Sequence, residues 1–197
     1  TYNGVALISR SPMQHLLTAF PKFDDPQRRI LMANLASLRI VNIYVPNGAS
    51  LDSEKYTYKL RWLKQLKAYL EQELVRHPNL IVLGDFNIAP EDRDVHDVKS
   101  WQGKVLVSPL ERQALKEIMA LGFKDSFRLF NNQSGHYTWW DYRAGAFRRN
   151  RGLRIDHILT SDALTSRCIA CDIDKEIQKK KKPSDHVPVV ASYQNIS

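Results

Sequence analysis

Four polar residues stand beside apolar segments that read as buried strands. One apolar run, residues 80–83, leads into Asp85 and Asn87, and Asp185 and His186 directly precede another. Carboxylate and amide oxygens are ligands for a hard divalent cation, and an imidazole can transfer protons near neutral pH. This combination of residue types points to metal-assisted phosphoryl chemistry.

Two further segments place polar groups at the end of a predicted strand. Tyr44 and Asn47 close the strand predicted at residues 39–45, and Asp156 ends the segment 150–156. Functional residues of α/β scaffolds gather on loops at one end of a sheet. A single Asp after a strand is usually a turn or cap residue, and a single Tyr usually packs. Four such segments in one chain favour a common site instead.

The residue types match what phosphodiester hydrolysis requires: an activated water, neutralised phosphate oxygens and a stabilised leaving group. Asp185 could bind a cation, while His186 could take a proton from water or hold a phosphate oxygen. Asp156 is the candidate carboxylate that orients this histidine. Asp85 could act on the attacking water or on the leaving oxygen. The neutral groups that could donate to a phosphate are Tyr44, Asn47 and Asn87.

An alternation of strands and helices would position these segments. Residues 39–45 read as a strand that is closed by the Pro-Asn-Gly turn signal at 46–48. Between residues 56 and 74, apolar side chains recur every three or four positions, which predicts a helix capped by Asp52 or Ser53. Strand, helix and strand in succession indicate an α/β organisation.

A second helix is predicted from its start signal. Ser108 and Glu111 form a capping box with a proline at the first helical position, and the helix should end near Leu121. Residues 92–104 are expected to form a loop. Other extended segments are expected at residues 5–9, 28–38, 80–83, 137–142, 154–160, 168–173 and 187–193.

Length and charge set the broad class. The 197 residues favour a single catalytic domain spanning 1–197. Lys and Arg outnumber Asp and Glu by 29 to 21, and a net charge of +8 favours nucleic acid first and an anionic membrane second. No apolar run is long enough for a bilayer. The two cysteines, Cys168 and Cys171, are too few for a disulfide framework, which favours a cytoplasmic location.

A basic segment with interleaved aromatic residues follows the predicted strand at 137–142. Its arginines are interleaved with Tyr142 and Phe147, and they are Arg143, Arg148, Arg149 and Arg151. Such a segment favours contact with DNA over a merely solvated loop. The lysine run 179–182 reads as a solvated loop, with phosphate steering as the alternative. His157 should point to the opposite face of its strand from Asp156 and pack there.

The chain resembles the exonuclease III family of apurinic/apyrimidinic endonucleases, within the endonuclease/exonuclease/phosphatase superfamily. The strings Trp-Asp-Tyr-Arg at 140–143 and Arg-Gly-Leu-Arg-Ile-Asp at 151–156 favour its bacterial-type DNA-repair branch. The matching segments are residues 4–6, 27–30, 44–48, 84–90, 122–128, 138–143, 150–156 and 182–188.

The resemblance implies a fold and an activity. We expect an α/β fold, a four-layer α/β/β/α sandwich in which two mixed β-sheets pack face to face between helices. We expect Mg²⁺-dependent hydrolysis of double-stranded DNA on the 5′ side of abasic sites, with trimming of 3′ ends by the same chemistry. Mn²⁺ is a possible substitute. Water is the expected nucleophile, and a monomer is the family's usual state.

The resemblance also assigns catalytic roles to particular residues. Tyr44 matches a phosphate-contacting tyrosine, and Asp85 matches the catalytic aspartate, which serves either proton transfer or a metal. Asn87 matches the asparagine that stabilises the transition state. Asp156 and His186 match an Asp–His pair.

The resemblance also implies which residues contact the substrate and the metal. Asn47 matches a phosphate-contacting asparagine, while Trp139 and Leu153 match positions lining the pocket for the flipped-out abasic sugar. Arg143 is the candidate DNA contact from the basic segment. The predicted metal ligands are Asp85, Asn87, Asp185 and His186.

The family pattern begins upstream of the segment that matches Thr1, with a strand bearing an asparagine and a segment bearing a metal-binding glutamate. We therefore expect the 197 residues to be the larger C-terminal part of a longer enzyme, lacking the first strands of one sheet. Two alternatives remain open. One is a phosphatase or phospholipase of the same superfamily, and the other is a DNA-binding chain without catalysis.

Overall fold

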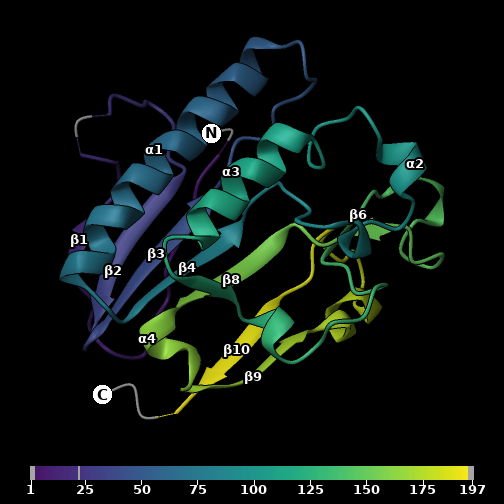
Figure 1. Ribbon diagram of the computed structural model, residues 1–197. Coiled ribbons are helices and arrows are strands. Elements are labelled where there is room, and N and C mark those ends of the chain that lie inside the picture. Colours follow the sequence, from purple (N-terminus) through teal and green to yellow (C-terminus); the bar gives the residue numbers. More distant parts are fainter. Residues whose placement is uncertain (1–2, 22, 195–197) are drawn as a thin grey trace.

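The computed structural model describes residues 3–21 and 23–194 and contains a six-stranded mixed sheet (Figure 1). Its strands run in the order β1-β2-β3-β4-β8-β5, where β3 and β4 are parallel and the other neighbours antiparallel. The bounds are β1 Gln14–Leu17, β2 Ile30–Leu35, β3 Leu38–Tyr44, β4 Leu80–Asp85, β5 Phe123–Asp125 and β8 Asp156–Ser161.

Two helices cover one face of this sheet, α1 (Glu54–Arg76) and α3 (Pro109–Met119) (Figure 1). The Ser53 hydroxyl accepts a hydrogen bond from the first turn of α1, and Ser108 and Glu111 form the capping box of α3. These contacts satisfy N–H groups that have no partner within a helix. Both predicted helix starts are confirmed.

The main core lies between the helices and the sheet because each element presents an apolar face. Leu80 and Val82 point from β4 toward the helices, whereas Ile81 and Leu83 point to the other side, as strand periodicity requires. The apolar stripe of α1 covers this core, and its fully buried members include Trp62, Leu63, Leu66 and Leu70.

The opposite face of the sheet meets a smaller antiparallel pair, β9 (Cys168–Ile173) and β10 (Val189–Tyr193). Tyr193 of β10 packs against the cluster that contains Ile81 and Leu164, the latter from α4 (Asp162–Thr165). Helices, the mixed sheet and the second pair of strands together confirm the expected α/β class. In the described part of the chain, β9 and β10 make up this second sheet.

The remaining elements are short. Trp139–Trp140 (β6) pairs with Gly152–Leu153 (β7), and Val98–Trp101 forms α2. Short 3-10 helices cover Asp92–Asp94, Phe127–Leu129, Arg143–Gly145 and Lys175–Lys179. None of the described helices combines the length and the apolar composition needed to cross a membrane.

Three predictions of local structure are wrong. Residues 5–9 do not form a paired strand, and Ile8 is 99% exposed, because apolar residues form a strand only where a neighbour accepts their backbone groups. Within the predicted loop 92–104, Asp97 caps the short helix α2. Helix α3 ends at Met119 rather than Leu121.

Candidate active site

Three of the predicted site residues lie in one row across the sheet. Tyr44 pairs with Asp85, and Asp85 pairs with Asp156, on the neighbouring strands β3, β4 and β8. Tyr44 and Asp85 end parallel strands, and Asp156 begins an antiparallel strand. All three residues therefore lie at the same end of these inner strands of the sheet. Sheet register alone therefore brings together residues that are 112 positions apart in the chain (44 to 156).

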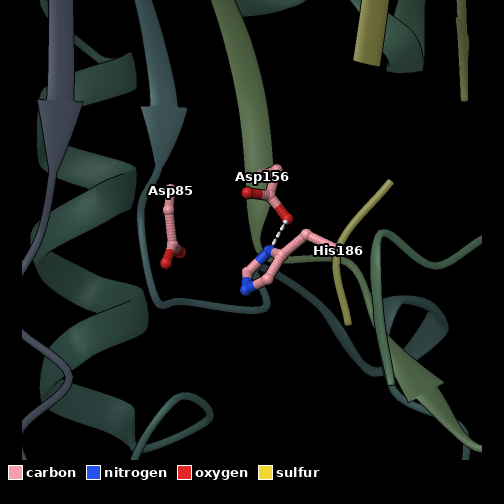
Figure 2. Close-up of side chains that lie close together, drawn as sticks. All are labelled: Asp85, Asp156 and His186. Carbon is pink, nitrogen blue, oxygen red and sulfur yellow. Dashed lines mark hydrogen bonds and ion pairs between the residues drawn. The ribbon is translucent and has the colours of Figure 1, made fainter. Parts of the chain in front are cut away.

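His186 reaches this row from the segment before β10. The segment pairs with β6, since the Trp140 N–H donates to the Asp185 carbonyl and the Val187 N–H donates to the Thr138 carbonyl. His186 Nδ1 then lies 2.8 Å from Asp156 Oδ2 (Figure 2). Asp85 lies across from this pair and makes no drawn contact to it.

The two titratable partners of Asp156 have shifted pKa values. Burial and the nearby charge of Asp156 together raise the pKa of Asp85 to about 7. Burial alone would lower the pKa of His186. The hydrogen bond and charge of Asp156, aided by Asp85 and Asp185, outweigh that effect and raise it to about 9. The site thus favours a proton on His186 and weakens the acidity of Asp85.

The same three residues could hold a metal ion. One ligand atom from each of Asp85, Asp156 and His186 lies within 4.8 Å of the others. Two carboxylates beside an imidazole are a donor set that suits a divalent cation. Of the four metal ligands predicted from the sequence, Asp85 and His186 belong to this group. Asp156, expected only to orient the histidine, belongs to it as well.

Two asparagines, Asn87 and Asn47, hold the Asp85 carboxylate in place through hydrogen bonds. The backbone N–H of Asn87 donates to Asp85 Oδ1 at 2.8 Å, and its side-chain amide donates to Asp85 Oδ2 at 2.9 Å. Asn47 Nδ2 donates to Asn87 Oδ1 at 3.0 Å. Asn87 has a φ of +50°, the left-handed region that asparagine tolerates better than most residues. The three predicted residues therefore form a continuous hydrogen-bonded chain.

Gly84 makes this close approach of strands possible. Its φ is +129°, and a Cβ atom at this position would lie 2.0 Å from the Ile43 carbonyl oxygen. Only glycine fits between β3 and β4 immediately before the catalytic candidate Asp85.

Tyr44 and Asn47 belong to a second part of the site. They line a cavity of about 540 Å³ together with Arg29 and Lys55. The Arg29 guanidinium lies 4.7 Å from the centre of the Tyr44 ring and donates to the Tyr44 carbonyl at 3.2 Å. Two cations beside a phenol and an amide would suit a phosphate group.

Asp185 lies outside the group that could hold a metal. Its Oδ2 accepts a hydrogen bond from Trp139 Nε1 at 3.1 Å. Trp139 is half-buried and is paired with Leu153 across β6 and β7, while Leu153 is fully buried. The two residues predicted to line a sugar pocket are thus in one place, but only the tryptophan is accessible.

Arg143 does not contact the Asp85 group. Its side chain is 90% exposed and pairs with Asp141 at 3.1 Å. The basic segment does border a cavity of about 590 Å³, whose lining includes Arg148, Lys182 and Asp185. Arg143 therefore lies at the surface beside the site and not within it.

Thr138 is a site residue that the sequence analysis missed. Its hydroxyl accepts hydrogen bonds from the backbone N–H groups of Ile155 and Asp156, at 3.0 and 3.1 Å. This buried contact joins β6 to the start of β8 and fixes the backbone of Asp156. A lone threonine before two tryptophans carries no sequence signal for such a role.

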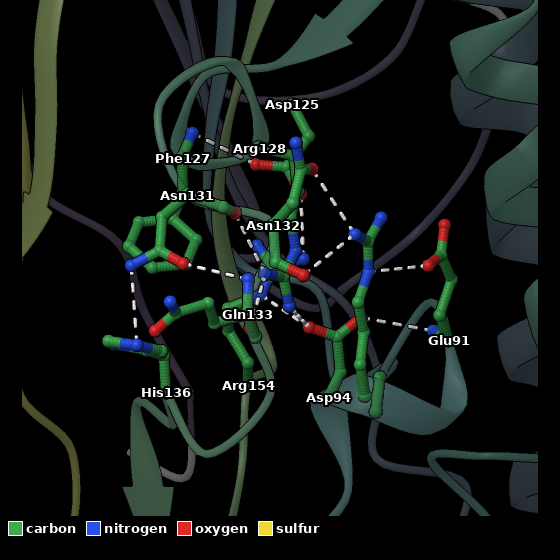
Figure 3. Close-up of polar contacts among 12 residues, drawn as sticks. Glu91, Asp94, Asp125, Phe127, Arg128, Asn131, Asn132, Gln133, His136 and Arg154 are labelled. Carbon is green, nitrogen blue, oxygen red and sulfur yellow. Dashed lines mark hydrogen bonds and ion pairs between the residues drawn. The ribbon is translucent and has the colours of Figure 1, made fainter.

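A second ionic cluster lies on the other side of β8. Arg154 pairs with Asp94 at 2.6 Å and with Asp125 at 2.7 Å, and Arg128 also binds Asp94 (Figure 3). His157 is buried, as its predicted orientation requires, and its ring contacts Arg154 Nη1 and the Ile88 carbonyl. Burial and the Arg154 charge lower the pKa of His157.

Comparisons with known proteins identify the family of this chain. The model of the Endonuclease/Exonuclease/phosphatase family matches residues 1–186. Exodeoxyribonuclease III of Haemophilus influenzae is 37% identical over 203 aligned positions, covering 96% of this chain and 76% of that protein. The DNA repair nuclease APEX1 of Danio rerio is 30% identical, covering 95% of this chain and 59% of its own length.

Two solved structures are similar to this chain in both sequence and fold. The 3′ phosphatase NExo from Neisseria, bound to a product DNA hairpin, is 41% identical with a TM-score of 0.92, covering 94% of this chain and 72% of that one. An AP endonuclease from Archaeoglobus fulgidus is 36% identical with a TM-score of 0.90, covering 94% and 73%. The chain thus spans about three quarters of the length of these structures.

Proposed function

The chain belongs to the endonuclease/exonuclease/phosphatase family, and on this basis we propose that it hydrolyses phosphodiester bonds in double-stranded DNA. The proposed positions of cleavage are the 5′ side of an abasic site and the 3′ end of a strand. The observation that carries the proposal is the Asp156–His186 pair facing Asp85 at one edge of the sheet. Relatives named as an exodeoxyribonuclease III and a DNA repair nuclease support the choice of substrate.

His186 is proposed to hold a phosphate oxygen. Its pKa of about 9 keeps the ring protonated at neutral pH, so Nε2 can donate to the negative charge that develops on the phosphate. Asp156 fixes the ring by accepting from Nδ1. Of the two roles open to this histidine from its sequence context, the raised pKa together with the bond to Asp156 favours charge stabilisation over proton abstraction.

Asp85 is proposed to accept the proton of the attacking water. A carboxylate with a pKa of about 7 is a stronger base than an ordinary aspartate and is still partly ionised at neutral pH. The N–H groups of Asn87 aim both of its oxygens. Tyr44 and Asn47, in the neighbouring cavity that Arg29 and Lys55 also line, would position the phosphate.

A divalent cation fits the Asp85, Asp156 and His186 group, and we propose Mg²⁺, with Mn²⁺ as a substitute. Mg²⁺ prefers oxygen, so the carboxylates of Asp85 and Asp156 would hold it, and Mn²⁺ would take the same oxygen ligands while the protonated His186 ring stays free for the phosphate. The cation would supply neutralisation of phosphate charge. Asn87 and Asp185 remain predicted ligands.

The substrate is proposed to approach over the basic segment. Arg148 and Lys182 line the cavity beside Asp185, and Arg143 is exposed at its margin. Trp139, accessible beside Asp185, would contact an extruded abasic sugar. We propose that the chain acts as one catalytic domain and as a monomer.

Cleavage of a duplex oligonucleotide with one abasic analogue tests the proposal. The protein that carries this chain should cut on the 5′ side of the lesion with Mg²⁺ and not with EDTA. Asp85→Asn should lose at least about 100-fold in rate because the proton acceptor is gone. The matched control is Lys67→Met, a partly exposed residue of α1 away from the site. A folded chain that leaves every duplex intact in Mg²⁺ and Mn²⁺ would contradict the proposal.

A second candidate is removal of a 3′-terminal phosphate. The structural likeness to a 3′ phosphatase, at a TM-score of 0.92, favours including it. The same assay with a duplex bearing a 3′-phosphate separates the two activities. Release of phosphate with no cutting of the abasic duplex would assign the site to the phosphatase reaction. Hydrolysis of a phosphoinositide or of sphingomyelin in place of DNA would assign it to the lipid branch.

A further inference from the structure

Lys59 is a buried cation directly beneath the candidate active site. It lies on α1 with 0% of its surface exposed, and its ammonium group has three partners. It donates to the carbonyl oxygen of Asn87 at 2.7 Å, to the carbonyl oxygen of Asn47 at 3.1 Å and to a carboxylate oxygen of Glu111. An ammonium group has three N–H bonds, so these contacts use all of its donors.

The ion pair with Glu111 does not by itself explain this arrangement. Glu111 already accepts from the backbone N–H groups of Leu106 and Ser108, both at 3.0 Å, and the bond from Ser108 belongs to the capping box of α3. Lys59 supplies a countercharge to that carboxylate, which a buried charge requires. Its other two bonds go to the backbones of the two asparagines that line the site.

These two backbone contacts lie at the start of the hydrogen-bonded chain that ends on Asp85. Asn87 has left-handed φ, and its N–H and side-chain amide both bind the Asp85 carboxylate. Asn47 binds the Asn87 side chain. Lys59 therefore fixes the backbone carbonyl groups of the same two asparagines, of which Asn87 binds Asp85 directly and Asn47 binds Asn87.

We propose that Lys59 is a positioning residue for the reaction: it ties the Asn47 and Asn87 loops to α1 so that Asn87 holds the Asp85 carboxylate in its working orientation. Lys59 does not touch the substrate. The kinetic part of this inference rests on the proposed function, because it needs an activity that depends on Asp85.

Four variants separate positioning from simple stabilisation. Lys59→Met removes the donors but leaves Glu111 buried without a countercharge, so it should also lower Tm. Lys59→Met with Glu111→Gln removes both charges and should recover most of that Tm. Glu111→Gln alone keeps the lysine and its bonds to the asparagines but leaves its ammonium group without a countercharge, so it should lower Tm as well. Lys67→Met breaks the partly exposed Lys67–Glu117 pair between the same two helices.

Steady-state kinetics on the abasic duplex give the first measurement. Both variants without Lys59 should lose about 100-fold in kcat with KM changed less than about threefold, because a small displacement of a catalytic group costs this much. Glu111→Gln and Lys67→Met should keep kcat within about threefold of the parent. Recovery of kcat along with Tm in the double variant would reduce Lys59 to an ion-pair partner and overturn the proposal.

Hydrogen exchange at the backbone amide of Asn87, measured by NMR, gives a second readout that needs no turnover. Its bond to Asp85 should protect this amide in the parent chain. The double variant should exchange it at least about tenfold faster while amides in the core of α1 are unchanged. Unchanged exchange at Asn87 overturns the proposal. Faster exchange in a chain that cuts no DNA would support positioning and refute the proposed function separately.

Discussion

Neighbouring residues on β8, Asp156 and His157, enter two clusters of opposite character. Asp156 faces His186 and Asp85, and His157 faces Arg154 on the other side of the sheet. In the first cluster a histidine has its pKa raised to about 9, whereas in the second burial lowers the pKa of His157. Both clusters combine carboxylates, a histidine and burial, so the difference lies in how their charges are matched.

The Arg154 cluster is compensated within itself. Two carboxylates, Asp94 and Asp125, face two guanidinium groups, and the charges of Arg154 and Arg128 overcome burial to lower the pKa of Asp94. The Asp85 cluster is uncompensated, because one imidazolium faces two carboxylates. The excess negative charge of such a cluster can bind a cation or take part in proton transfer. In a cluster with matched charges, the ion pairs serve the fold alone.

Replacing Arg154 tests the structural half of this comparison and should have the largest effect. Arg154→Leu would leave Asp94 and Asp125 buried with too few cations. Breaking a buried pair costs about 3–5 kcal/mol of unfolding free energy. Urea unfolding measures the loss. Arg93→Leu is the control, since its pair with Glu91 is partly exposed and should cost less than about 1 kcal/mol. A loss for Arg154→Leu no larger than that of its control would show that the cluster is not structural.

Replacing Asp156 tests the catalytic half. Asp156→Asn removes the carboxylate that orients the His186 ring and stabilises its protonated form. The kcat on the abasic duplex should therefore fall about 10²–10³-fold. Because Asp156 is the strongest raising influence on the pKa of His186, that pKa should also fall, and the alkaline limb of the pH–rate profile should move to lower pH.

Unfolding free energy should change much less in Asp156→Asn than in Arg154→Leu. Urea unfolding of the two variants side by side gives this comparison directly. Equal losses of stability, with little change in kcat for Asp156→Asn, would mean that both clusters serve the fold.

The two histidines should make stability depend on pH in opposite directions. The pKa of His186 is raised from 6.5 to about 9, so its contribution is complete below pH 6.5 and is lost as the pH rises through 9. The pKa of His157 is lowered from 6.5, so stability falls as the pH drops below 6.5 and the unfolded chain takes up a proton.

Unfolding midpoints in urea between pH 5 and 9.5 measure both slopes. His157→Gln should flatten the acid side, and His186→Asn should flatten the alkaline side. If His157→Gln flattened the alkaline side of the curve, or His186→Asn the acid side, the charge states assigned to the two histidines would be wrong.

The sequence predicted the parts of the molecule that depend on local patterns. The stripe of residues 56–74 and the Ser108 capping box predicted α1 and α3, because helix periodicity and capping are written in neighbouring residues. The contact between Asp156 and His186 followed from residue types at strand ends and is present. Residues 5–9 were predicted wrongly, since pairing depends on a partner strand that composition does not reveal.

The buried charges were missed for a related reason. Arg154 and Asp94 are 60 positions apart, and only the fold brings them together. Lys59 did carry a signal, because it lies three positions after Tyr56 and four before Leu63, on the buried stripe of its helix. A lysine on an apolar face indicates a buried partner, but not that its partners would be the backbones of Asn47 and Asn87.

The smallest expected effect comes from the pair that Lys67 forms with Glu117 between α1 and α3. It joins the same helices as Lys59 and Glu111, but its side chains are 38% and 45% exposed, against 0% for the buried pair. Water and salt screen an exposed pair, so Lys67→Met should change the unfolding free energy by less than about 0.5 kcal/mol and leave kcat unchanged. Urea unfolding at low and high salt measures this. A loss above about 1 kcal/mol would mean that an exposed ion pair between the helices stabilises the fold strongly. Burial would then not be what distinguishes the structural ion pairs of this molecule from the others.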